Sequence, residues 1–173
     1  MTHTQLSNME LVDLRGFVAY PSQPPQIGQT ISATINHLRA ENRAADLSTW
    51  EENDIAGRFI SEPILEEIDD GQVLVADITR LNFNVVFEVG YAIGRRKRAY
   101  LIRSSAIAGS DDLIRKVGIF DTLGYERYDS SRNLASHLKA ISSTRPLAVP
   151  ENAPNKVAPV YLLLPRTKTH ERS

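Results

Sequence analysis

One carboxylate stands inside an otherwise apolar, small-residue stretch of this sequence. The stretch runs from Asn82 to Arg98 and reads NFNVVFEVGYAIGRRKR, with Glu88 near its middle. A carboxylate buried among valines and glycines costs free energy unless something compensates for it. It can also stabilise positive charge that develops on a bound molecule. Glu88 is therefore the first candidate for chemistry.

Glu88 falls on a predicted helix from about Asn84 to Arg96. One face of this helix carries Val85, Val89 and Ala92, and Glu88 borders that face. The helix dipole near the N-terminus stabilises a carboxylate, whereas partial burial raises its pKa. The sequence leaves open which effect is larger. It also leaves open a structural role, in which Glu88 pairs with Arg95 or Arg96.

Two other features of this stretch have simpler interpretations. Gly90 and Gly94 form a bare strip, and each costs about 1 kcal/mol relative to alanine inside a helix. Close approach of backbone or ligand would explain them. The basic run Arg95–Arg98 lies at the helix C-terminus, where cations offset the dipole, and we interpret it as a solvated face.

The elements that must position Glu88 alternate between strands and helices. Apolar runs predict strands at 16–20, 46–50, 73–77, 99–103 and 125–128. Helical spacing predicts helices at 27–44, 55–68, 84–96 and 130–141, with a short one possible at 111–116. This order predicts an α/β fold, a flavodoxin-like or Rossmann-like three-layer sandwich with a parallel sheet of about five strands.

Polar and aromatic residues follow three of these strands. Ligands bind beyond the carboxyl ends of the strands in an open parallel sheet. We therefore predict a substrate pocket at that edge, lined by Tyr20, Ser22, Trp50, Asp77, Thr79, Asn82 and Asn84. Some of these residues also have structural interpretations. Asp77 can cap the next turn, Trp50 can be a core aromatic, and Asn84 is the favoured helix N-cap.

Composition excludes several function classes. The net charge of −1 gives no basic field for nucleic acid or an anionic membrane. There are no cysteines and the four histidines are scattered, so we predict no metal site. The N-terminus lacks the pattern of a signal peptide, and no apolar run is long enough to span a membrane. We expect a cytoplasmic protein.

The C-terminal part has a different composition. Residues 1–142 form the predicted α/β domain, and the proline-containing segment 143–158 is a predicted linker. Residues 159–173 begin with a new apolar run, PVYLLLP, that is similar to the first strand and its exit. We interpret 159–173 as the start of a further domain. The alternative is a sixth strand with a C-terminal tail.

The segment from Asp77 to Gly94 resembles a known signature, D-x-T-x-x-N-x-N-V-x-x-E-x-G-x-A. It belongs to bacterial nucleoside 2-deoxyribosyltransferase-like and TIR-like domains. The resemblance covers roughly Gly16 to Arg103 and is specific around Glu88. It implies that Glu88 acts on an N-glycosidic bond, either by attacking the anomeric carbon or by holding the ribose hydroxyls and stabilising the cation that forms.

One departure from the transferases favours the second role. Their fuller pattern has an aspartate where this chain has Asn82, and an amide cannot serve as a base. The resemblance therefore implies an NAD(+)-cleaving hydrolase, with NAD as substrate and no cofactor. It also implies the effector part of a multidomain anti-phage protein that acts after self-assembly or with a sensor partner. The alternatives are a deoxyribosyltransferase and a non-catalytic nucleotide-sensing module.

Overall fold

A computed structural model describes residues 14–41, 45–53, 61–109 and 122–141, together with Ile114, Val117 and Phe120. The strands are β1 (Leu14–Ala19), β2 (Ala45–Thr49), β3 (Val73–Asp77), β4 (Arg98–Ser104) and β5 (Tyr125–Tyr128). The helices are α1 (Pro25–Ala40), the short 3-10 helix η1 (Trp50–Glu52), α2 (Ser61–Asp70), α3 (Phe83–Gly94) and α6 (Ser131–Lys139). The predicted linker 143–158 and the predicted segment 159–173 lie outside the described residues. So do most of the predicted short helix 111–116 and the beginning of the predicted helix 55–68.

The five strands form one parallel sheet in the order β2-β1-β3-β4-β5. This is the flavodoxin-like order, in which the chain first winds outward from β1 to β2 and then returns to the other side of β1. The prediction of a three-layer α/β sandwich with about five parallel strands is confirmed. Among the described helices, none is long and apolar enough to cross a membrane.

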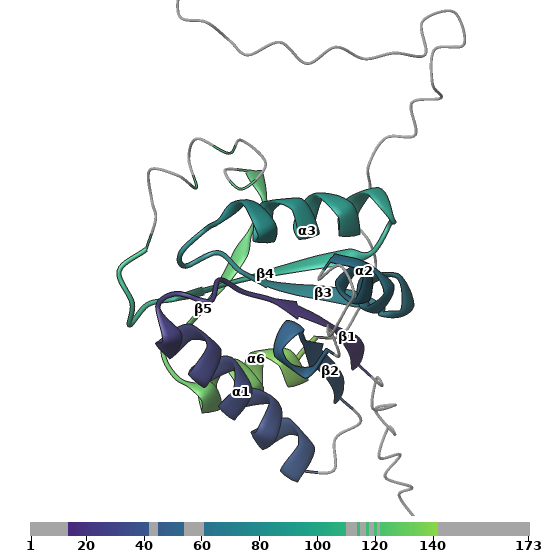
Figure 1. The fold of residues 1–173 in the computed structure, drawn as a ribbon. Helices are drawn as coiled ribbons and strands as arrows, with labels where there is room; N and C mark the ends of the chain where they lie inside the picture. Colours follow the sequence, from purple (N-terminus) through teal and green to yellow (C-terminus); the bar gives the residue numbers. More distant parts are fainter. Residues whose placement is uncertain are drawn as a thin grey trace, which may run out of the picture.

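Helices cover both faces of the sheet, as Figure 1 shows. Alternate residues of β3 point to opposite faces, so that Val73 and Val75 join one core while Leu74 and Ala76 join the other. The first core contains the apolar residues of α1 and α6, and the second contains those of α2 and α3. A strand that is apolar throughout is what burial on both faces requires.

The predicted boundaries of two strands, β3 and β5, agree with the structure residue for residue. The predicted start of the Glu88 helix at about Asn84 is within one residue of Phe83, but the favoured N-cap is wrong, because Asn82 and not Asn84 caps the helix. The Asn82 side chain accepts a hydrogen bond from the Val85 backbone N–H, at 2.9 Å. Asn84 is exposed inside the first turn. Both asparagines suit a cap, and the extended backbone of Asn82 decides between them.

Candidate functional site

The site begins where the sheet reverses its winding direction. β1 and β3 are neighbours, but the chain leaves them towards opposite faces, through α1 after β1 and through α3 after β3. No helix can fill the gap above both strand ends, which makes this edge the usual ligand site of open α/β sheets. Tyr20 follows β1 and Asp77 ends β3, so two of the predicted site residues flank this point.

Glu88 lies in the second turn of α3 and is buried. Its exposed fraction is 8%, and burial raises the pKa of its carboxyl group from 4.5 to about 7. No described residue makes a hydrogen bond or an ion pair with its carboxylate. Burial is thus the cause of the raised pKa.

One of the two arginines considered as partners for Glu88, Arg95, contacts a different carboxylate. Arg95 Nε lies 2.6 Å from Asp69 Oδ1, and Tyr91 donates a hydrogen bond to the other carboxylate oxygen of Asp69 at 2.9 Å. These contacts fix α3 against the end of α2. They give Arg95 a structural role, and they leave the Glu88 carboxylate without a compensating charge from that residue.

Asp77 and Thr79 belong to a buried hydrogen-bond network. Asp77 accepts hydrogen bonds from the Thr79 backbone N–H at 2.8 Å and from the Tyr128 hydroxyl at 2.6 Å. Thr79 in turn accepts one from the Ser104 backbone N–H at 2.7 Å. Asp77 and Thr79 have no exposed surface, so in this structure both contact only protein groups. The turn-capping interpretation of Asp77 is confirmed, and direct substrate contact stays a prediction.

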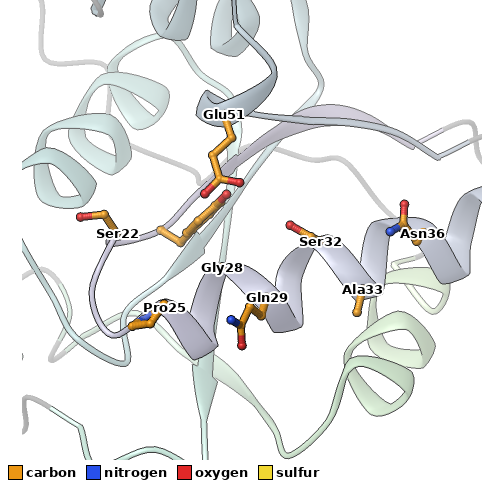
Figure 2. Close-up of a pocket in the computed structure, with 9 residues that line it drawn as sticks. Ser22, Pro25, Gly28, Gln29, Ser32, Ala33, Asn36 and Glu51 are labelled. Carbon is orange, nitrogen blue, oxygen red and sulfur yellow. The ribbon is translucent and has the colours of Figure 1, made fainter.

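Tyr20 and Ser22 do lie together, in an open pocket of about 480 Å³ between α1 and η1. The remaining lining residues are Pro25, Gly28, Gln29, Ser32, Ala33, Asn36 and Glu51. Figure 2 shows Glu51 pointing from η1 toward α1. The described lining residues provide hydroxyl and amide groups and a single carboxylate, and none of them is a lysine or arginine. It therefore suits an uncharged or cationic polar group better than a phosphate.

The Tyr20 hydroxyl has an unusual position in this pocket. Tyr20 is 5% exposed, and its oxygen is buried without a hydrogen bond that meets ordinary geometry. Burial raises its pKa to about 12, and the negative charge of Glu51 acts in the same direction. The ring lies 6.1 Å from that of Trp50, which packs against both cores. A buried unpaired hydroxyl is a group that a ligand could satisfy.

The structure therefore divides the predicted site into three parts. Tyr20, Ser22 and the neighbouring Trp50 lie at the pocket side, Asp77 and Thr79 are in the buried network, and Glu88 is on α3 with Asn82 as its cap. Glu88 is not among the residues that line the pocket.

Sequence reasoning missed two residues of this region. Tyr128 holds Asp77, and its pKa is raised by burial and by that carboxylate. Glu51 is the one charged side chain among the described residues of the pocket lining. Both follow or end predicted strands, so their position at the carboxyl edge was the available signal. Among the described residues, no three histidine, aspartate or glutamate side chains are grouped to hold a metal ion.

The fold is that of a flavodoxin-like α/β protein, and the candidate site lies at the carboxyl edge of its sheet. Several solved structures are similar to this chain, and three of them, each at low identity, illustrate the likeness. The Clostridium botulinum CMP N-glycosidase BcmB is 16% identical with a TM-score of 0.46, over 72% of this chain and 97% of that one. A conserved protein from Enterococcus faecalis V583 is 16% identical with a TM-score of 0.50, over 72% and 98%. An archaeal flavodoxin is 9% identical with a TM-score of 0.42, over 75% and 94%.

At these identities the likeness is one of fold. The Enterococcus faecalis protein, with its TM-score of 0.50, supports the three-layer architecture over most of both chains. No protein-family model matches the sequence, and no curated protein sequence does either.

Proposed function

We propose that this protein hydrolyses the N-glycosidic bond of NAD(+) or a related nucleotide, with Glu88 as the carboxylate that stabilises the sugar cation. The observation that carries the proposal is the state of Glu88. It is a buried carboxylate with a pKa raised to about 7, without a partner among the described residues, on the helix that starts at the carboxyl edge of the sheet. Strongly perturbed groups of this kind are concentrated at functional sites.

The proposed step needs one carboxylate and no metal. The bond between C1′ of the ribose and the ring nitrogen of nicotinamide breaks, and its electron pair goes to that nitrogen. Nicotinamide leaves as a neutral base, because the nitrogen was cationic in NAD(+). The ribose cation that remains is stabilised by the Glu88 carboxylate and captured by water, which releases its proton to solvent. The products are nicotinamide and ADP-ribose.

The raised pKa of Glu88 bears on this mechanism. At neutral pH, a group with a pKa of about 7 is ionised in about half of the molecules. The cationic nicotinamide ring of NAD(+) beside Glu88 would favour the ionised form, because an opposite charge lowers a carboxyl pKa. Binding of NAD(+) would thus supply the charge that the described protein residues do not supply.

Two features support the hydrolase over the transferase alternative. Asn82 stands where the transferase pattern has an aspartate, and its side-chain oxygen is occupied by the Val85 backbone N–H. It therefore caps α3 and has no group that could act as a base. The resemblance of the 77–94 segment to TIR-like domains is what favours NAD as substrate, and with it an effector role in a multidomain antiviral protein.

The test is the release of free base by the full chain at high protein concentration. NAD(+), CMP and 2′-deoxynucleosides are incubated with the protein, and products are separated by liquid chromatography. We expect nicotinamide and ADP-ribose from NAD(+), and loss of at least 100-fold in rate for Glu88→Gln. Glu126→Gln is the matched control and should keep the wild-type rate. Glu126 is exposed, and its strand β5 is an edge strand separated from β1 by β3 and β4.

Three results would contradict the proposal in different ways. A Glu88→Gln variant with the wild-type rate removes Glu88 from the mechanism. Exchange of bases between deoxynucleosides, with NAD(+) untouched, identifies a transferase. Binding of a nucleotide without release of base identifies a sensing module.

A further inference from the structure

The outer face of α3 is apolar where a surface helix is normally polar. Among the described residues, the exposed large hydrophobic side chains are Phe83 and Phe87, with exposed fractions of 87% and 55%. Both lie on α3, one turn apart. Scattered surface hydrophobics are normal, but two exposed aromatics on adjacent turns of one helix indicate a contact surface.

The C-terminal half of the same helix face carries no side chains, because its residues are glycines. Gly90 and Gly94 are exposed, and a Cβ atom added at either position would meet nothing within 4 Å. By contrast, a Cβ at Gly16 would lie 2.1 Å from the Val73 carbonyl oxygen, so that glycine is required by packing. Packing within the chain does not require Gly90 or Gly94, although glycine disfavours a helix interior.

These four residues form one seam. The positions 83, 87, 90 and 94 follow the alternating spacing of four and three that keeps residues on one side of a helix. Glu88 is the only charged residue of α3, and it is buried on the opposite side. The seam is therefore uncharged along its length, with large side chains in its N-terminal half and none in its C-terminal half.

We propose that this seam binds the same seam of a second copy of the chain, with the two α3 helices antiparallel. In that arrangement Phe83 faces Gly94 of the second copy, and Phe87 faces Gly90 of the second copy. Each aromatic ring enters the space that a glycine leaves open. The contact is self-complementary about a twofold axis, as the interface of a symmetric dimer must be.

The area that the aromatic rings can bury is smaller than a standard dimer interface, so we expect a dimer that dissociates at low protein concentration. An aromatic side chain buries about 150–250 Å². With the exposed fractions of Phe83 and Phe87, two copies would bury on the order of 600 Å² through four rings. A standard interface buries at least about 1,200 Å². The flanking residues of α3 that are only partly buried, Val86, Tyr91 and Ile93, would have to supply much of the rest.

Sedimentation equilibrium of the full chain tests this proposal. We expect a monomer–dimer equilibrium, weakened at least tenfold by Phe83→Ser and by Gly90→Ala. Gly124→Ala is the matched control and should leave the equilibrium unchanged, because a Cβ there also meets nothing within 4 Å. A wild-type chain that stays monomeric, or a dimer that tolerates both variants, overturns the proposal.

Cross-linking tests the antiparallel arrangement, because the chain has no cysteines. A mixture of the Phe83→Cys and Gly94→Cys variants should form a mixed disulfide dimer under mild oxidation, whereas each variant alone should not. Cross-linking of Phe83→Cys with itself would indicate parallel helices and overturn the arrangement. If the wild-type chain is monomeric by sedimentation and still releases base, the dimer proposal fails and the proposed function stands.

Discussion

The two buried carboxylates at the carboxyl edge of the sheet differ in what surrounds them. Asp77, at the end of β3, has no exposed surface and accepts hydrogen bonds from Thr79 and Tyr128. Glu88, on α3, is 8% exposed and has no such partner among the described residues. Burial raises both pKa values, but for Asp77 the hydrogen bonds act against it, and for Glu88 burial is the only cause.

This difference separates a structural carboxylate from a candidate functional one. Buried polar groups are normally hydrogen-bonded, so Asp77 is accounted for by the fold. A buried carboxylate without partners lowers stability, and a protein retains such a group at a site where the charge acts on something else. The comparison leads to predictions in which the two residues respond in opposite directions.

The largest expected effect on stability is that of Asp77→Ala. The substitution leaves two buried donors, the Thr79 N–H and the Tyr128 hydroxyl, without an acceptor. Each unsatisfied group costs about 1–3 kcal/mol, so the free energy of unfolding should fall by about 3–5 kcal/mol. Urea denaturation measures it. An unchanged midpoint would show that the network contributes nothing.

The Glu88→Gln variant should instead be more stable than the wild type, by an amount that depends on pH. The folded pKa of about 7 lies above the ordinary value of 4.5, so ionisation disfavours the folded state. The resulting penalty is absent below pH 4.5, grows between pH 4.5 and 7, and is complete above pH 7. Removal of the charge should therefore stabilise the protein by up to about 3 kcal/mol above pH 7.

Urea denaturation at pH 5 and pH 8.5 checks this prediction. The gain over the wild type should be small at pH 5 and largest at pH 8.5. A variant that is less stable than the wild type at pH 8.5 would show that Glu88 has a stabilising partner, and the contrast with Asp77 would disappear.

Tyr128→Phe should have a smaller effect than Asp77→Ala, since it removes one hydrogen bond and leaves one in place. The Asp77 carboxylate keeps its bond from the Thr79 N–H. We expect a loss of about 1.5–2 kcal/mol, in the range of hydrogen bonds to charged groups. In a double-mutant cycle of Asp77→Ala and Tyr128→Phe, the two losses of stability should be strongly non-additive. Additive losses would indicate that the Tyr128–Asp77 bond is not formed in solution.

The smallest expected effects on stability are those of alanine substitutions at two helical glycines, one in α1 and one in α3. Gly90→Ala should stabilise the monomer by about 1 kcal/mol, because Ala favours a helix and the added methyl group meets open space. Gly28→Ala should gain less, because its Cβ would lie 3.1 Å from the Tyr20 ring. Thermal unfolding at low protein concentration measures both. Equal shifts in melting temperature for the two variants would mean that the Tyr20 ring moves aside without cost.

Much of the fold could be predicted because its signals are local. The uninterrupted apolar run of β3 and the helical spacing of Ile27, Ile31 and Ile35 each identify an element, and their alternation restricts the topology to a parallel sheet. The exact start of α3 could not be predicted. Asn82 and Asn84 have the same capping chemistry, and only the backbone conformation at Asn82 distinguishes them.

The candidate site was less predictable because its contacts are distant in sequence. Asp77 and Tyr128 meet only after β5 joins the sheet, and no pattern around either residue indicates that contact. The pocket residues of α1, such as Ser32 and Asn36, look like ordinary surface residues in the sequence. Glu88 was predictable because a charge in an apolar helix conflicts with its surroundings at the local level.

The most direct test of the central claim is the pH dependence of base release from NAD(+) by the wild type and by Glu88→Gln. If the ionised carboxylate stabilises the sugar cation, kcat/KM of the wild type rises with pH through an apparent pKa near 7. The residual rate of the variant should lack that rise. A rise of equal size in both proteins, or a wild-type rate that falls with pH across this range, would contradict the role given to Glu88.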